Sequence, residues 1–327
     1  MLEVLRKQTV RLAKTIFPYR FSSFNLLFTR FCNASCRMCV KTHYDDKVKS
    51  RIYLDQGTLE NALRQLGSMG VRDINIFAMS EPLVHPKFND YIGQIVNAGF
   101  RVIFSTNGEL LKRKHFEALN KVHSIGYSIE GYDDETVRHY RGVSFQKVID
   151  GLAGLREAVG NKPLTLRTTL YRGMEEAYLE KFMSVWAKYF DELVVTAANP
   201  PHLYHTPLPT DINCSLDEFY TFKRNPRKRC EITRSEVAIL PNGDVAECTE
   251  DYASRFLFGN INDKHLKEII EGEDLARFHA RLREGVENVC GECTVFYSII
   301  PEHGAIVERF AGRAHEIFQT MKAGNAR

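Results

Sequence analysis

Short apolar segments alternate with amphipathic segments from residue 24 to about residue 200. The apolar segments have the length of buried strands, and the segments between them carry apolar residues at helical spacing. We predict strands at 24–28, 74–77, 102–104, 125–129, 164–170 and 193–197, with helices near 59–66, 91–97, 111–119, 145–158 and 179–189. Six strand-and-helix units are typical of a parallel α/β sheet, either open or closed as a barrel, with its active site at the carboxyl ends of the strands.

The pattern changes after this first region, which spans residues 24–200. We expect an irregular connector at 201–229 and a second, smaller module at 230–300. The module contains a hairpin-like segment whose turn is Asn242-Gly243, a strong signal for a tight turn. Helices are predicted at 266–271 and 275–282.

Both ends of the chain have helical patterns. Residues 301–327 carry Phe310, Ala314, Ile317 and Met321 at helical spacing, which predicts a terminal helix packed on the first region. Residues 1–23 include a basic amphipathic segment, which either packs on its own domain or makes a weak contact with an anionic membrane surface.

Composition excludes several classes of protein. The 327 residues include 44 basic and 41 acidic side chains, and the net charge of +3 gives no sign of nucleic-acid binding. No apolar run is long enough to span a membrane. The eight cysteines are too few for a disulfide scaffold and are clustered in spacings typical of metal sites, so a cytoplasmic location fits best.

Three cysteines lie close together directly after the first predicted strand. Cys32, Cys36 and Cys39 form a C-x3-C-x2-C array. Zinc sites and four-cysteine clusters usually require a fourth ligand, which is not close in sequence, whereas a three-cysteine iron–sulfur cluster leaves one iron open to bind a small molecule. A structural zinc loop and three incidental buried cysteines are the alternatives.

Further polar motifs follow the next three predicted strands. They are Met79-Ser80-Glu81-Pro82, then Thr106-Asn107-Gly108, and then Ser128-Ile129-Glu130-Gly131. With the cysteine array, they resemble the motifs of the radical S-adenosylmethionine (SAM) enzymes. The resemblance implies a partial (β/α)6 TIM-like barrel and a [4Fe-4S] cluster on Cys32, Cys36 and Cys39 that binds SAM.

The same resemblance assigns roles to these motif residues. It implies that Ser80 and Glu81 hold the amino group of SAM, that Asn107 lies near the ribose, and that Ser128 and Glu130 face SAM or the substrate. Met38 takes the place of an aromatic residue near the adenine. The chain departs from the family pattern at Met79 and Ser80, which replace glycines, and at Glu130, which replaces the commoner aspartate.

One arginine and a basic run are candidates for binding anions. Arg167, on the fifth predicted strand, suits a bidentate contact with the SAM carboxylate or with an anionic group of the substrate. A surface salt bridge is the alternative. The basic residues between Lys223 and Arg229 either hold a phosphate or form a solvated face.

The second module has its own group of cysteines. Cys230, Cys248, Cys290 and Cys293 supply four thiolates, enough to saturate either a zinc ion or a cluster. Beside a radical SAM barrel, their spacing resembles the twitch form of the SPASM-type extension, which carries an auxiliary [4Fe-4S] cluster. It is especially similar to the spacing in aminocyclitol dehydrogenases.

The resemblance implies an enzyme that cleaves SAM to a 5′-deoxyadenosyl radical, with electrons from a partner such as flavodoxin or ferredoxin. The leading hypothesis is an oxidoreductase that dehydrogenates a small sugar, aminocyclitol or nucleotide-linked substrate, with the auxiliary cluster as electron acceptor. Modification of a peptide or protein is a second hypothesis, and a non-catalytic zinc-binding module is a third. Cys214 is either a buried thiol or a hydrogen-atom donor, as in the epimerases of the family.

Overall fold

The computed structural model describes the units that the sequence predicts, together with parts of the C-terminal region. The described residues are 21, 23–37, 39, 52–77, 80–170, 174, 176–197, 222–224, 236–246, 254, 256–284, 297–299 and 301–325. The basic N-terminal segment and most of the connector at 201–229 lie outside them. Within the described part of the chain, no helix combines the length and the apolar character needed to cross a membrane.

Six parallel strands form the centre of the fold and follow one another in chain order. They are β1 (Ser23–Leu26), β2 (Asp73–Ile76), β3 (Arg101–Thr106), β4 (Ser124–Ser128), β5 (Leu164–Leu170) and β6 (Glu192–Ala197). Phe24 pairs with Ile74, and Ser128 with Arg167. The predicted parallel sheet is confirmed, because period-two and apolar patterns marked each strand to within two residues.

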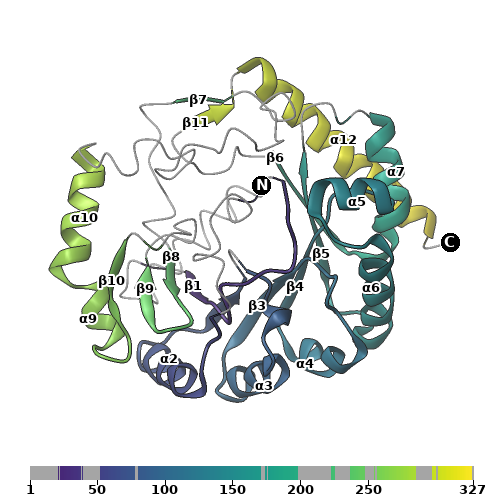
Figure 1. Ribbon diagram of the computed structural model, residues 1–327. Helices are drawn as coiled ribbons and strands as arrows, with labels where there is room; N and C mark the ends of the chain where they lie inside the picture. Colours follow the sequence, from purple (N-terminus) through teal and green to yellow (C-terminus); the bar gives the residue numbers. More distant parts are fainter. Residues whose placement is uncertain are drawn as a thin grey trace.

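Helices follow the strands and lie on the outer side of the curved sheet (Figure 1). They are α2 (Gln56–Ser68), α3 (Phe88–Asn97), α4 (Phe116–Lys121), α5 (Asp134–Arg141), α6 (Phe145–Val159) and α7 (Glu176–Trp186), with short 3-10 turns η2 (Pro82–Val84), η3 (Arg113–His115) and η4 (Ala187–Tyr189). Capping side chains fix where several of them begin. The Oδ1 of Asp55 accepts a hydrogen bond from Thr58 N–H at 2.8 Å at the start of α2.

The two faces of the parallel sheet differ in polarity. Successive residues of a strand point to opposite faces. The outer face consists of fully buried apolar residues such as Ile74, Val102 and Leu166, which are covered by the helices. A paired row on the inner face is polar or small: Ser105 lies opposite Gly126, Gly126 opposite Thr165, and Thr165 opposite Glu192. The core therefore lies between sheet and helices, and the inner face is left for polar contacts.

The predicted hairpin of the second module extends the same sheet. It consists of β8 (Glu236–Ile239) and β9 (Asp244–Ala246), joined by a turn in which Gly243 has φ +88°. This confirms the tight turn at Asn242-Gly243. β8 pairs in parallel with β1, and β10 (Leu257–Asn260) pairs with β9, so the strand order is β10-β9-β8-β1-β2-β3-β4-β5-β6. The sequence did not predict this pairing of β8 with the first strand.

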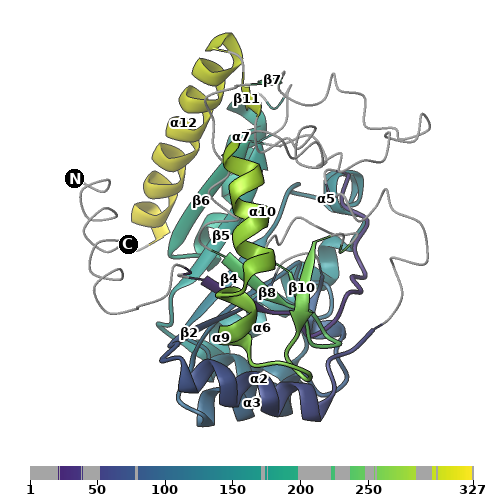
Figure 2. The same ribbon diagram turned by 90° about the vertical axis from the view of Figure 1, so that its left-hand side faces the viewer.

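Two helices accompany these added strands, as the sequence predicts. They are α9 (Leu266–Ile270) and α10 (Glu273–Glu284), and Figure 2 shows them beside β8 and β10. A separate antiparallel pair joins β7 (Phe222–Arg224) to β11 (Tyr297–Ile299).

The chain ends in a long helix, α12 (Pro301–Asn325), that packs on α7 and β6. Ala314, Ile317 and Phe318 are buried in this contact. Arg313 forms an ion pair with Glu176 of α7 at 2.6 Å. The predicted terminal helix and its packing on the barrel are confirmed, because the apolar stripe at helical spacing is the face that is buried.

Candidate functional site

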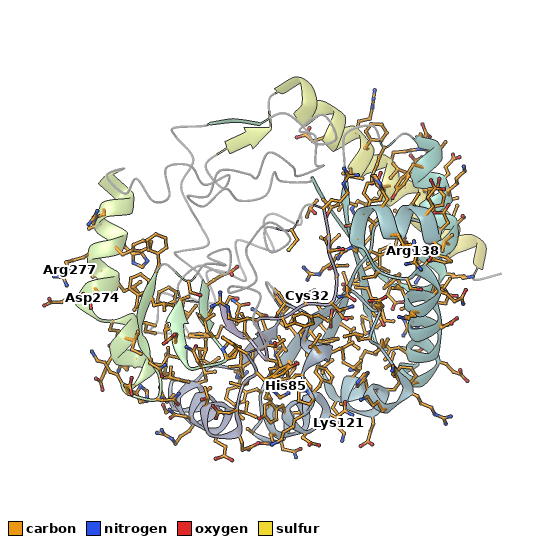
Figure 3. The ribbon with its side chains drawn as sticks, viewed as in Figure 1. Cys32, His85, Lys121, Arg138, Asp274 and Arg277 are labelled. Carbon is orange, nitrogen blue, oxygen red and sulfur yellow. The ribbon has the colours of Figure 1, made fainter. Side chains whose placement is uncertain are left out.

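The cysteine loop begins where β1 ends, at the carboxyl edge of the parallel sheet. Cys36 is buried, while Cys32 and Cys39 are half-buried. Cys39 N–H donates to the carbonyl of Cys36 at 3.0 Å, which forms a turn between these two ligands. Figure 3 shows Cys32 on the inner side of the strands, away from the outer rim where Lys121 and Arg277 project.

The three thiols share this loop but do not form a closed ligand group in this structure. Among the described residues, no three His, Cys, Asp or Glu side chains meet closely enough to hold a metal ion. Binding a cluster therefore requires the loop to draw its three sulfurs together.

The surroundings of two sulfurs nevertheless suit cluster ligands. Asn107 Nδ2 donates to the Sγ of Cys32 at 3.8 Å, and an Arg141 guanidinium N–H donates to the Sγ of Cys36 at 3.6 Å. N–H donors of this kind stabilise thiolates, and hydrogen bonds to ligand sulfurs are typical of iron–sulfur sites. Three soft sulfur donors with N–H partners therefore fit an iron–sulfur cluster.

Glu81 lies beside the cysteine loop, directly after β2, and is 1% exposed. Its N–H donates to the carbonyl of Phe31 at 3.1 Å. Its carboxylate accepts hydrogen bonds from Leu83 N–H at 3.1 Å, Thr106 Oγ1 at 2.9 Å and Asn107 N–H at 2.8 Å. The carboxylate thus joins the ends of β2 and β3 under the cysteine loop, and the neighbouring Ser80 is half-buried.

Burial raises the pKa of Glu81 from 4.5 to about 7, although the hydrogen bonds from Asn107, Leu83 and Thr106 and the charge of Arg141 act in the opposite direction. The folded chain then binds a proton that the unfolded chain releases, so the free energy of unfolding falls as pH rises from the lower pKa through the higher one. We expect Glu81→Gln to remove about 2 kcal/mol of this loss between about pH 5.5 and pH 8. Urea unfolding of the cluster-free chain at both pH values measures it, and identical pH dependence in the two chains would contradict the prediction.

Asn107 connects three parts of the site. Its side chain donates to the Oδ1 of Asn33 at 3.0 Å as well as to Cys32. Asn33 donates in turn to the Oε2 of Glu109 at 2.7 Å. Sequence reasoning did not find Asn33 or Glu109, although both lie inside or directly beside the motifs that it selected.

Glu130 is fully buried after β4, and its carboxylate is engaged by the chain itself. One oxygen pairs with the Nε of Arg141, and the other accepts from Thr169 N–H at 2.9 Å. Ser128, two residues earlier, is half-buried on the inner face. Sequence reasoning gave Arg141 no role; the signal was its place in α5, which a capping interaction between Asp133 and Thr136 starts.

Arg167 lies on the inner face of β5 and is exposed. Its side chain crosses β4 at Gly126, where an added Cβ would lie 2.9 Å from the Nε of Arg167. Its guanidinium carbon is 5.9 Å from the centre of the Phe77 ring, directly after β2. The cation therefore reaches across the inner face toward the strand end that carries Glu81.

Several predicted site residues lie outside the described residues. They are Met38, Cys214, Cys230, Cys248, Cys290 and Cys293. The described strands β8, β9 and β10 come from the region that contains Cys230 and Cys248.

Sequence comparison identifies the class of protein. Residues 26–185 match the Radical SAM superfamily, and residues 230–294 match SPASM, an iron–sulfur cluster-binding domain. The chain therefore belongs to the radical SAM superfamily and carries a SPASM domain, which implies binding of SAM and of iron–sulfur clusters. The predicted resemblance is confirmed, and the matches favour an enzyme over a zinc-binding module.

Individual relatives are distant but span most of the chain. The chain is 22% identical to the tungsten-containing aldehyde ferredoxin oxidoreductase cofactor-modifying protein of Pyrococcus furiosus, over 83% of this chain and 86% of that protein. It is 21% identical to the S-adenosyl-L-methionine-dependent 2-deoxy-scyllo-inosamine dehydrogenase of Niallia circulans, over 84% and 92%. The crystal structure of BtrN in complex with AdoMet and 2-DOIA is similar in fold, with a TM-score of 0.53, 18% identity, and coverage of 84% of this chain and 92% of that chain.

Proposed function

We propose that this radical SAM enzyme dehydrogenates an alcohol group of a small sugar, aminocyclitol or nucleotide-linked substrate. The observation that carries the proposal is the similarity to the inosamine dehydrogenase, which extends over the barrel and the SPASM region together. Two [4Fe-4S] clusters are proposed, one on Cys32, Cys36 and Cys39 and an auxiliary one on Cys230, Cys248, Cys290 and Cys293.

The bound cofactors supply the reductive cleavage of SAM and the hydrogen-abstracting radical. The chain's own residues position the reactants. The cysteine loop, Glu81 and Asn107 together hold the SAM end of the site at the carboxyl edge of β1, β2 and β3. The polar inner face, with Ser128 and Thr165, provides hydrogen-bonding groups suited to a hydroxylated substrate.

Arg167 is proposed to bind an anion inside the barrel, either the SAM carboxylate or an anionic group of the substrate. Its exposure on the inner face and its reach toward Phe77 support this role. A planar guanidinium that already rests on the bare backbone of Gly126 loses little freedom when it binds a carboxylate or a phosphate.

The proposed oxidation removes one hydrogen atom from carbon, one proton from the hydroxyl group and one electron, which leaves a ketone. The four cysteines of the SPASM region are proposed to hold the acceptor of that electron. An external donor such as flavodoxin or ferredoxin is proposed to supply the electron that SAM cleavage consumes.

Replacement of Cys290 by alanine tests the proposed acceptor. We expect the variant to retain part of its SAM cleavage but to lose the oxidised product by at least about tenfold, because the fourth thiolate ligand is missing. The assay incubates reduced enzyme with SAM and 2-deoxy-scyllo-inosamine, or with a panel of sugar and nucleotide-sugar alcohols, and mass spectrometry follows the loss of two hydrogens. Unchanged yield of the ketone would remove the acceptor role, and a product of unchanged mass would point to epimerisation, with Cys214 as the candidate hydrogen donor.

A second candidate is the modification of a larger substrate. The similarity to the cofactor-modifying protein of Pyrococcus furiosus covers as much of the chain as the similarity to the dehydrogenase and favours this candidate. Peptide or protein modification belongs to the same group of large substrates. A product found only when reduced enzyme is incubated with a protein fraction, and not with the small-molecule panel, would favour this second function.

A further inference from the structure

The last turn of α5 and the cysteine loop are held together by two backbone hydrogen bonds. Ser35 N–H donates to the carbonyl of Arg141 at 3.1 Å, and Arg37 N–H donates to the carbonyl of Tyr140 at 3.1 Å. These two donors flank Cys36. The carbonyls at the end of a helix have no partner within it, so the loop satisfies them and is fixed in register with α5.

Gly142 permits this close approach. It ends α5 in the left-handed conformation, with φ +65° and ψ +27°, and an added Cβ would lie 1.9 Å from the Oγ of Ser35. A side chain at this position would therefore push the cysteine loop away from the helix.

The side chain of Arg141 makes a third connection between α5 and the loop. One guanidinium N–H donates to the Sγ of Cys36 at 3.6 Å, while Nε pairs with Glu130. The Arg141 side chain is 9% exposed and that of Glu130 is 0% exposed. Glu130 is fixed in turn by Thr169 N–H of β5 at 2.9 Å. A chain of buried polar contacts therefore runs from β5 through Glu130 and Arg141 to one cysteine of the array.

From this geometry we infer that Glu130 and Arg141 are positioning residues for Cys36, and that their paired charges set the reduction potential of the cluster bound there. Arg141 places a positive charge and an N–H donor on the ligand sulfur, which favours the reduced, more negative cluster. Glu130 compensates that charge and prevents an isolated buried cation. The pair therefore keeps Cys36 in place while limiting how far the cation raises the potential.

This role differs from the direct contact with SAM or substrate that the S-x-D-G resemblance implies for Glu130. Both carboxylate oxygens of Glu130 are engaged within the chain, one by Arg141 and the other by Thr169. The carboxylate instead acts through Arg141 on the cluster ligand.

The two substitutions that remove one charge each should have opposite effects. We expect Arg141→Gln to shift the midpoint potential to more negative values, because the cationic donor is lost. Glu130→Gln should shift it to more positive values, because Arg141 is left uncompensated. The potential is measured by redox titration with electron paramagnetic resonance, for the cluster whose signal changes when SAM is added, in preparations with equal iron content.

Arg138→Gln is the matched control. Arg138 lies one turn earlier on α5, and its exposed side chain pairs with Asp134 at 2.7 Å (Figure 3). Its replacement should leave the potential unchanged. A potential that is unchanged in both Arg141→Gln and Glu130→Gln, or that moves in the same direction in both, would overturn the electrostatic role.

Hydrogen exchange of the cluster-free chain tests the positioning role without any cluster. Amide exchange in residues 31–37 should be at least about tenfold faster in Arg141→Gln than in Arg138→Gln, because the side-chain connection to the loop is lost. Equal exchange in the two variants would overturn the positioning role. Arg141→Lys keeps the charge but not the fork of donors, and it should recover the potential better than the exchange protection.

Discussion

Replacement of Cys32 by alanine is expected to abolish the formation of 5′-deoxyadenosine from SAM in the presence of dithionite. Cys32 is one of only three cysteines on the loop after β1, and the nearby Asn107 Nδ2 donates to its sulfur at 3.8 Å. Loss of one thiolate from three leaves the proposed cluster without enough ligands to be retained. We therefore expect SAM cleavage to fall to background and the iron and sulfide content to fall by about half.

Two variants make this expectation specific. Ser35→Ala changes an exposed position of the same loop without removing a sulfur, and it should keep most of the iron and the SAM cleavage. Cys290→Ala should also lose about half of the iron but retain part of the cleavage, because its cluster is the auxiliary one. Continued formation of 5′-deoxyadenosine by Cys32→Ala would refute the assignment of the cysteine loop.

Local sequence patterns predicted most of the barrel. The strands and helices between residues 24 and 197 repeat two simple periodicities, and the burial of one face of each element fixes them. The hairpin turn at Asn242-Gly243 was equally accessible, because left-handed backbone at Gly243 is a local requirement. The strand ends then located Glu81 and Asn107, since parallel strands bring such residues to one edge.

Contacts between distant parts of the chain could not be predicted in this way. β8 pairs with β1, so that Phe24 lies opposite Val237, and no periodicity encodes the choice of neighbour for an edge strand. The contact of Arg141 with Cys36 spans 105 residues and depends on the closed end of α5. The short helix α5 escaped the prediction because its eight residues carry only one fully buried apolar side chain, Val137.

Gly131 holds the turn that joins Glu130 to α5, and its backbone is fixed on both sides. Its N–H donates to the hydroxyl group of Tyr178 at 2.8 Å, and its carbonyl accepts from the indole N–H of Trp186 at 2.8 Å. Its φ is +92°, and an added Cβ would lie 2.4 Å from the backbone nitrogen of Val137. Because this obstacle is the backbone of α5 itself, no rotation of a side chain can relieve it.

We therefore expect Gly131→Ala to lower the free energy of unfolding by about 3 kcal/mol or more, from left-handed strain and a backbone clash combined. Gly99→Ala is the matched control: Gly99 has φ +89° but nothing within 4 Å of an added Cβ, so only the strain of about 1 kcal/mol remains. Urea unfolding of the cluster-free chains, followed by circular dichroism, measures the difference. The displaced α5 should also release the cysteine loop, so hydrogen exchange in residues 31–37 should rise in Gly131→Ala and not in Gly99→Ala. Equal stability of the two variants would show that α5 moves freely, and would remove the rigid support that the contact between Arg141 and Cys36 requires.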